Sequence, residues 1–322
     1  MINPIEFNTI DGFTTGHAQD PDAGTGCSVV ISPAGAVAGV DVRGGAPGTR
    51  ETDLLDPVNL VELVHAVFLS GGSAFGLDAS AGIMAYLEEH DIGFDVPVGK
   101  VPIVAGAVLF DLVVGKSHIR PDKNMGYQAC VQARSNRVLQ GCIGAGTGAC
   151  VGKIAGMDRA MKSGLGCHAV EVGDLQIGAM VAVNCLGDVI DPSSGRPVAG
   201  VLTPDKQRIG STEEIMVRNW NQHKNPFVSN TTIGVILTNA TLTKSKAKKL
   251  ASMAHNGFAR TLRPAHSMFD GDTIFTMGSG KIEADLSVVG LLAAQVMEQA
   301  VLNAIRYADA AHGLPCSGDI VG

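Results

Sequence analysis

Polar and apolar positions follow a strand period in one stretch of the C-terminal third and a helix period in the next. In residues 231–239, Ile233, Val235 and Leu237 point to one face, while Ile236 lies on the other. Apolar residues on both faces predict a central strand covered on both sides. Residues 243–259 then show helical spacing behind Thr243, a good N-cap residue, and predict an amphipathic helix. Its expected buried stripe is Ala247, Leu250, Ala251, Ala254 and Phe258.

Further strands and helices are predicted along the rest of the chain. We expect a hairpin of strands 27–31 and 36–42, a helix over 58–69 that begins at Asp56-Pro57, a helix over 74–89, strands at 102–114, 174–188 (as a pair) and 269–277, and a helix over 287–311 capped by Ser287. In the Gly-rich residues 141–166 we expect strands that cross closely near a site. A nucleotide-binding loop is disfavoured because Ile154, and not Ser or Thr, follows Lys153. Residues 191–229 predict a long, mobile surface linker.

Composition narrows the function classes. Glycine is abundant (41 of 322 residues) and aromatic residues make up only 4%, so the core is expected to consist of small aliphatic side chains with close backbone approaches. The net charge of −7 disfavours nucleic-acid binding, and the lysine cluster at 244–249 is expected to be a solvated helix face. The sequence contains no apolar run of about 18 residues, so no membrane span is expected. Seven cysteines without a Cys-x-x-Cys pair predict reduced thiols, a cytoplasmic protein and no zinc site.

The junction Asn230-Thr231 is the first candidate for chemistry, because a central strand begins there directly after a polar stretch. A threonine hydroxyl is a weak nucleophile, but a free α-amine on the same residue, with a pKa of roughly 7.7–8.0, is a suitable general base. Self-cleavage before Thr231 would create that amine, and Asn230 tolerates the turn that the cleavage needs. On spacing alone, an ordinary strand start after a turn is the more frequent explanation.

Asp270-Gly-Asp272 and Lys153 are the other candidates. Two carboxylates at i and i+2 on a strand share a face, where they could orient a threonine amine. A calcium loop or a turn is the alternative, although no further acidic residues continue a metal-binding pattern. A lysine in a Gly-rich stretch is usually at the surface, but a buried Lys153 would place a positive group near the nucleophile.

Several motifs together resemble the L-aminopeptidase/D-amidase–esterase family, which includes the β-aminopeptidases and nylon oligomer hydrolase. They are Arg43-Gly-Gly-Ala-Pro-Gly-Thr-Arg-Glu-Thr-Asp53, Ser70-Gly-Gly-Ser-Ala-Phe-Gly-Leu-Asp78, Gly144-Ala-Gly-Thr-Gly148, Asn230-Thr-Thr-Ile-Gly-Val-Ile-Leu-Thr-Asn239 and Asp270-Gly-Asp-Thr-Ile-Phe275. The resemblance implies an α+β fold, a four-layer αββα sandwich of the N-terminal-nucleophile type in one domain over 1–322. It also implies self-cleavage into fragments 1–230 and 231–322, and a homotetramer.

The same resemblance implies roles for individual residues. Thr231 would be the nucleophile, and Asp270 and Asp272 would orient and charge its amine. Lys153 would hold the Thr231 hydroxyl, and Asn184 would donate to the oxyanion. Phe110 stands where nylon oligomer hydrolase has a tyrosine, which weakens the case for polyamide substrates. No cofactor and no metal are implied.

Three functions remain in competition. The first is a self-processed amidohydrolase or aminopeptidase for short peptides, amino-acid amides or esters, with linear 6-aminohexanoate oligomers as an alternative substrate. The second is acyl transfer of the ornithine acetyltransferase type, whose flanking motifs fit less well. The third is a non-catalytic oligomeric scaffold in which the glycines serve packing alone.

Overall fold

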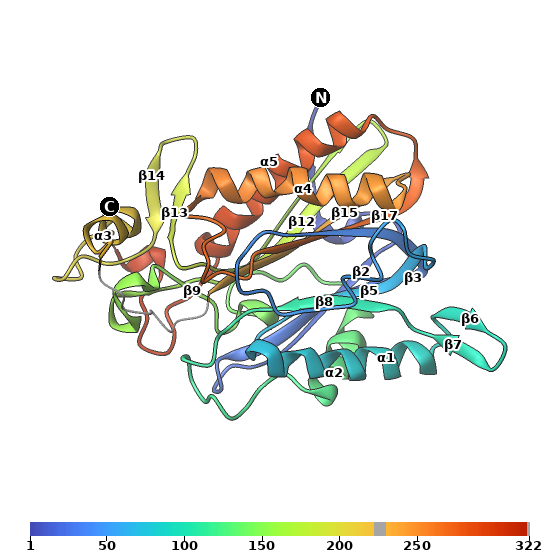
Figure 1. Ribbon diagram of the computed structural model, residues 1–322, viewed down its shortest axis with the longest axis horizontal. Coiled ribbons are helices and arrows are strands. Elements are labelled where there is room, and N and C mark those ends of the chain that lie inside the picture. Colours follow the sequence, from blue (N-terminus) through green and yellow to red (C-terminus); the bar gives the residue numbers. More distant parts are fainter. Residues whose placement is uncertain (222–229, 321–322) are drawn as a thin grey trace.

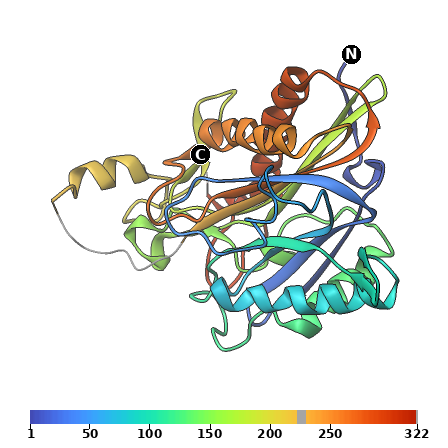
Figure 2. The same cartoon turned by 45° about the vertical axis from the view of Figure 1, so that its right-hand side comes forward.

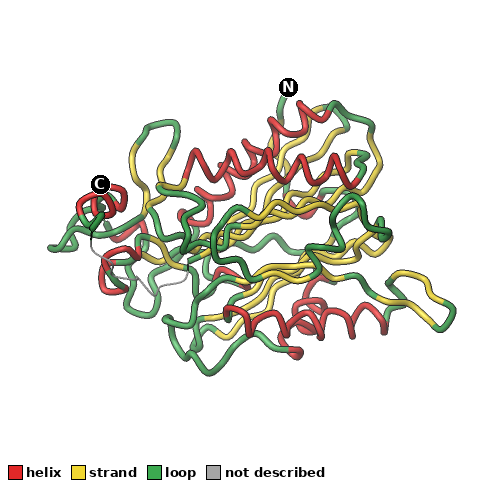
Figure 3. The backbone as a smooth tube through the Cα atoms, viewed as in Figure 1, coloured by secondary structure: helices red, strands yellow, loops and turns green. Residues whose placement is uncertain are grey.

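The computed structural model describes residues 1–221 and 230–320, which form four layers. Two β-sheet layers face each other, with α4 and α5 outside one and α1 and α2 outside the other (Figures 1 and 3). The helices are α1 (Ala79–Glu89), α2 (Lys123–Ala133), α3 (Thr212–Arg218), α4 (Lys244–Thr261) and α5 (Leu286–Arg306). The strands are β1 (Asn3–Ile5), β2 (Thr14–Asp20), β3 (Thr25–Val42), β4 (Thr49–Arg50), β5 (Leu63–Ser70), β6 (Phe94–Val96), β7 (Gly99–Val101), β8 (Val104–Val108), β9 (Cys150–Val151), β10 (Met161–Lys162), β11 (Leu165–Val172), β12 (Leu175–Asn184), β13 (Asp188–Asp191), β14 (Arg196–Ala199), β15 (Thr231–Ala240), β16 (Leu262–Arg263) and β17 (Thr273–Ile282).

The strand β3 joins the two sheet layers. One layer has the order β1-β11-β12-β15-β17-β3, and β3 continues into the other layer, where it pairs with β2 and β5, followed by β8 and β4. The β15–β17 pair is parallel, and a parallel pair needs a long crossover connection, which α4 provides. The central position of β15 between β12 and β17 confirms the prediction for 231–239.

Three apolar layers hold the sandwich together. One lies between the helices α4 and α5 and their sheet, one between the two sheets and one beneath α1 and α2. Small residues bring backbones together: at Gly39 of β3, an added Cβ would lie 2.2 Å from the backbone nitrogen of Lys248 on α4. Burial of this kind stabilises by about 25 cal/mol per Å² of apolar surface.

The helix α4 agrees closely with its prediction. The Thr243 side chain accepts a hydrogen bond from Lys246 N, and all five predicted stripe residues are buried. The lysine cluster is only partly a solvated face, because Lys244 is buried and its Nζ donates to the carbonyls of Leu54 and Asn59. The helix α5 is capped by Asp285 rather than Ser287. It is long and apolar enough to cross a membrane, but 67% of its apolar window is buried inside the fold.

Two predictions in the N-terminal third are wrong. Residues 63–70 form the strand β5 and not a helix, because Val64 to Ser70 are buried on both sides and such a strand shows a continuous apolar run. Val58 and Leu60, which the predicted helix would have buried, are 89% and 87% exposed. The expected hairpin over 27–43 is instead the single long strand β3, whose register against β5 shifts between Ile31 and Ala36.

Other elements are shorter or different from those predicted. Helix 74–89 begins with a 3-10 turn, strand 102–114 is reduced to β8, and the pair at 174–188 is one strand, β12, whose partner β11 precedes it. The Gly-rich residues 141–166, where strands that cross closely are expected, form 3-10 turns and the short paired strands β9 and β10.

The segment 191–221 is not a linker. It contains β14 and α3, and α3 lies at one side of the sandwich (Figure 2). Val201 and Leu202 are buried. The buried carboxylate of Asp188 accepts from Val201 N at 2.8 Å and from Thr212 N at 2.7 Å, which fastens this segment to β13. The remainder of the predicted linker, 222–229, lies outside the described residues.

Replacing Gly39 with alanine tests the close approach of β3 and α4. The new Cβ would collide with the α4 backbone, so we expect Gly39→Ala to cost about 1–3 kcal/mol, a typical penalty for overpacking. Gly210→Ala is the matched control, because there the nearest atom would be 3.3 Å away. Melting temperatures compare the two variants, and equal values would contradict a tight β3–α4 contact.

Candidate active site

Thr231 lies at the start of β15, between the neighbouring strands β12 and β17. It is the first residue of β15, is 3% exposed, and is paired across the sheet with Asn184, the last residue of β12. Its Oγ1 contacts the carbonyl oxygen of Asn230. The same oxygen accepts a hydrogen bond from Gly271 N at 3.1 Å. The hydroxyl therefore lies against the peptide carbonyl that self-cleavage would attack, and a backbone N–H already polarises that carbonyl.

The two predicted carboxylates lie just before β17 and are both buried. Asp272 Oδ1 accepts from Thr232 N at 2.8 Å, one residue from the candidate nucleophile. The backbone of Asp270 forms an isolated parallel β-bridge with Asn230, and its Oδ1 accepts a hydrogen bond from Leu186 N at 3.2 Å. Burial and the nearby charge of Asp272 raise the pKa of Asp270 to about 6.

Lys153 is buried, at 1% exposure, and follows β9 in a 3-10 turn. Its Nζ donates to the backbone oxygen of Asn184 at 2.8 Å and to Asn184 Oδ1 at 2.9 Å. Burial lowers the pKa of the Lys153 amine, and the charges of Asp270 and Asp111 are among the groups that oppose this shift. Asn184 Nδ2 donates to the backbone oxygen of Phe110 at 2.9 Å.

The structure thus brings all of the predicted site residues together. Both hydrogen bonds of the Lys153 Nζ go to Asn184, which is the strand partner of Thr231. One Nζ hydrogen of Lys153 and one Nδ2 hydrogen of Asn184 are left over among the described residues. The roles expected for the two side chains stay predictions.

A cavity of about 100 Å³ opens beside Thr231. It is lined by Ala46, Pro47, Gly48, Ser73, Ala74, Val108, Leu109, Phe110 and Thr231. Two of the motif segments, 43–53 and 70–78, thus contribute to its wall. Backbone hydrogen bonds hold the segment 43–53 against the main chain of the two aspartates. Ala46 N donates to the backbone oxygen of Asp270 at 2.8 Å, and Arg43 N donates to the backbone oxygen of Asp272 at 2.9 Å.

Four buried or partly buried polar residues near the site were missed from the sequence. His266 and Ser267 contact the carboxylates of Asp272 and Asp270, respectively. Lys162 donates to three backbone oxygens of the Gly-rich segment. Burial raises the pKa of Asp111 to about 6, and its carboxylate accepts from Thr25 and from Gly72 N. In the sequence these are isolated polar residues without a motif or a regular spacing, so the sequence alone does not identify them.

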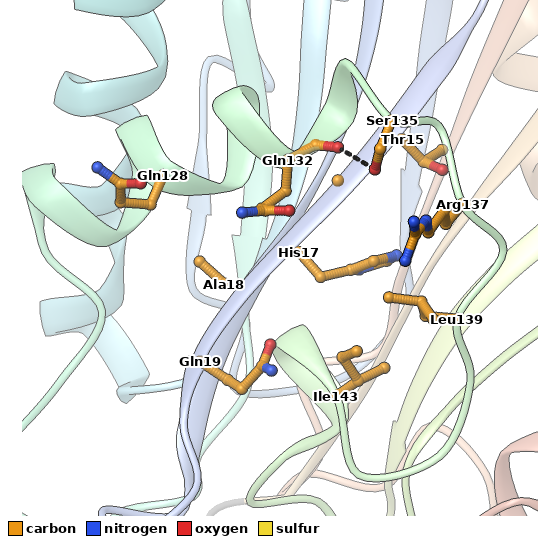
Figure 4. Close-up of a pocket in the computed structure, with 11 residues that line it drawn as sticks. Thr15, His17, Ala18, Gln19, Gln128, Gln132, Ser135, Arg137, Leu139 and Ile143 are labelled. Atoms are coloured by element: carbon orange, nitrogen blue, oxygen red, sulfur yellow. Dashed lines mark hydrogen bonds between the residues drawn. The ribbon is translucent and has the colours of Figure 1, made fainter.

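A second cavity, of about 480 Å³, lies between β2, α2 and the loop that follows α2 (Figure 4). His17 is at its floor, with Nδ1 2.9 Å from Ser28 Oγ. Burial lowers the pKa of His17 to about 4, so the ring is neutral at pH 7. None of the lining residues is acidic, so the histidine lacks the orienting carboxylate of a nucleophilic triad. This cavity therefore gives no nucleophilic triad that would compete with the expected role of Thr231.

Comparison with known proteins decides the family. Residues 8–316 match the model of peptidase family S58. The chain belongs to this family. An uncharacterized aminopeptidase of Mycobacterium leprae is 41% identical, with 98% of this chain and 94% of the relative covered. A 6-aminohexanoate-oligomer endohydrolase of Paenarthrobacter ureafaciens is 31% identical, with 91% and 84% covered.

Solved structures show the same fold. A β-aminopeptidase of a Burkholderia species has a TM-score of 0.70 at 18% identity, covering 97% of this chain and 91% of its own. The L-aminopeptidase D-Ala-esterase/amidase of Ochrobactrum anthropi, described as a variant of the Ntn hydrolase fold, has a TM-score of 0.69 at 19% identity, covering 96% and 88%. The expected four-layer fold of an S58 peptidase is confirmed. Within residues 1–221 and 230–320, no group of three His, Cys, Asp or Glu side chains could hold a metal ion.

The raised pKa of Asp270 predicts a pH-dependent stability. The folded chain binds this proton more tightly than the unfolded chain, whose ordinary value is 3.8. The stabilisation is fully present below about pH 4 and is lost as the pH rises through about 6, an effect on the order of 2–3 kcal/mol. Asp270→Asn in a Thr231→Ala background, which lacks the hydroxyl expected to cut the chain, should therefore lose less stability between pH 4 and 7 than Thr231→Ala alone. If the melting temperatures of the two variants change equally between pH 4 and 7, this assignment is refuted.

Proposed function

We propose that this S58 peptidase cuts itself between Asn230 and Thr231 and then hydrolyses amide bonds with Thr231 as an N-terminal nucleophile. Membership in a peptidase family makes the chain a hydrolase of amide bonds. The contact of Thr231 Oγ1 with the Asn230 carbonyl, which Gly271 N–H also contacts, carries the assignment of the nucleophile. The neighbouring carboxylates and Lys153 support it.

Self-cleavage would proceed in two steps. Thr231 Oγ attacks the carbonyl carbon of Asn230, and the Gly271 N–H stabilises the negative oxygen that develops. The bond between Asn230 C and Thr231 N breaks, the nitrogen takes up the hydroxyl proton and becomes an amine, and an ester joins Asn230 to Thr231 Oγ. Water then hydrolyses the ester, leaving a carboxylate on Asn230 and a free Thr231.

Substrate turnover would repeat the same chemistry on another amide. The α-amine of Thr231 accepts the hydroxyl proton as Oγ attacks the substrate carbonyl, and this proton passes to the leaving amine. An acyl-enzyme forms and water hydrolyses it. Asp270 and Asp272 would orient the α-amine, Lys153 would hold the hydroxyl, and Asn184 would donate to the oxyanion.

The substrates we propose are short peptides, amino-acid amides and esters with a free amino end. The carboxylates of Asp270 and Asp272 are buried beside Thr231, and they favour a second cation near the amine. The aminopeptidase name of the Mycobacterium leprae relative agrees with this substrate class.

Linear 6-aminohexanoate oligomers are a second candidate, since an endohydrolase for such oligomers is 31% identical. Phe110 argues against them, because it lines the cavity and carries no hydroxyl. Acyl transfer of the ornithine acetyltransferase type and a non-catalytic scaffold find no support in the family match. A homotetramer and a cytoplasmic location stay proposals, the latter supported by seven free cysteines.

Replacing the nucleophile tests the cleavage. Thr231→Ala should stay one chain and be inactive, because one hydroxyl serves both reactions, whereas Thr231→Ser should keep some cleavage. Intact mass and denaturing gels of the wild-type protein should show fragments Met1–Asn230 and Thr231–Gly322, which stay associated under native conditions. A different N-terminus on the small fragment, or an active Thr231→Ala protein, would refute the assignment.

Blocking the substrate amine tests the specificity. The processed enzyme should hydrolyse an amino-acid p-nitroanilide at least 10-fold faster than its N-acetylated form, since acetylation removes the cation that the buried carboxylates favour. Release of p-nitroaniline gives kcat/KM for both compounds. Equal values would show that no free amine is recognised, while leaving the nucleophile assignment intact.

A further inference from the structure

His266 holds Asp272 by two hydrogen bonds. The backbone N of His266 and its ring Nδ1 each lie 2.9 Å from Asp272 Oδ2. The other oxygen, Oδ1, accepts from Thr232 N at 2.8 Å. One carboxylate is therefore fixed at both oxygens, and only the Oδ1 side faces the residue that follows the nucleophile.

The hydrogen-bond partners define the ring's tautomer. A carboxylate oxygen accepts, and Asp272 Oδ2 already accepts from the backbone N–H of His266, so Nδ1 of His266 carries the hydrogen. Aromatic rings hold the imidazole in place: its centroid is 4.8 Å from that of His255, in an edge-to-face arrangement, and 6.3 Å from that of Phe258. The His266 side chain is only 20% exposed. A ring packed in this way cannot swing away from Asp272 without disturbing both neighbours.

The adjacent residue does the same for the second carboxylate. Ser267 donates to Asp270 Oδ2 through its backbone N, at 3.2 Å, and through its hydroxyl. Two consecutive residues thus hold the two acids that are expected to orient the nucleophile. The backbone of His266 is left-handed, with φ of 57°, and this unusual conformation aims both of its donors at one oxygen.

We propose that His266 is a positioning residue for both self-cleavage and turnover. It touches neither Thr231 nor the substrate cavity, and it acts by keeping the Asp272 carboxylate aimed at the start of β15. This inference rests on the proposed function, because it assigns His266 a task only if Asp272 orients Thr231. Without the ring donor, each oxygen of Asp272 keeps one backbone N–H, and the carboxylate is held less firmly.

A pair of substitutions separates the donor from the backbone conformation. Asparagine and glycine both tolerate a left-handed φ, but only asparagine offers an N–H close to the place of Nδ1. His266→Asn should retain most of the wild-type rate. His266→Gly should lower kcat and the rate of self-cleavage roughly 10- to 100-fold, the effect of losing one charge-assisted hydrogen bond, with KM nearly unchanged. His266→Ala, which also lacks the donor, serves if the glycine variant does not accumulate.

His312 provides the matched control. It also has a left-handed backbone, with φ of 52°, and its ring Nε2 lies 3.0 Å from the Pro21 carbonyl oxygen. His312→Asn and His312→Gly should leave kcat unchanged. Wild-type rates in both donor-less His266 variants, or equal losses in His266→Asn and His266→Gly, would overturn the proposal. Failure of the proposed function itself gives a different result, namely cleavage and activity in Thr231→Ala.

Discussion

The position of one peptide group constrains everything around it. The carbonyl of Asn230 directly precedes β15 and lies beside the loop that carries Asp270 and Gly271. Gly271 N–H binds its oxygen, and the hydroxyl of the next residue lies against it. Shifting β15 by one residue would turn Thr231 to the opposite face and leave the hydroxyl without the carbonyl, the carboxylates and the cavity. The register of β15 against β12 and β17 is therefore a requirement of the chemistry as well as of the core.

The interior of this site is unusually rich in titratable groups. Lys153, Asp270, Asp272 and His266 are all largely buried, and most of their hydrogen bonds go to backbone groups. Such partners do not titrate, so they keep each side chain oriented whatever its charge. A buried polar network of this kind is costly when one member is missing, and this explains why motif loops distant in sequence converge on a few backbone contacts.

Local sequence predicted those elements whose burial is simple. The helix α4 has one apolar stripe and a threonine cap, and β15 has apolar residues on both faces, so each was recognisable from its period. The strand β5 has the same two-sided burial, but Asp56-Pro57 before it resembles a helix start, and the tertiary position decided against the local signal. The long strand β3 was divided at Ser32-Pro-Ala-Gly35 because a bend between two sheets and a hairpin turn use the same residue types.

The site was predictable only in part. Thr231, Asp270 and Asp272 stand out because they are close to strand ends in recognisable motifs, and Lys153 because it lies in a Gly-rich stretch, whereas Asn184 was assigned through family resemblance alone. Nothing in the sequence shows that Lys153 bonds to a residue 31 positions away or that His266 turns back on Asp272, because these contacts depend on how the loops fold over one another.

The interleaving of β15 and β17 with strands from earlier in the chain has a consequence for the life of the molecule. Their sheet neighbours, β12 and β3, both precede residue 230. Folding of the continuous chain brings these strands together in one molecule, and the proposed cut at Asn230–Thr231 would remove the covalent link that makes this assembly unimolecular. A cut protein that later unfolds has to recover its missing half by diffusion, so its renaturation depends on concentration. If the proposed cleavage takes place, the finished enzyme is maintained by the height of its unfolding barrier, and its fold can be acquired efficiently only once.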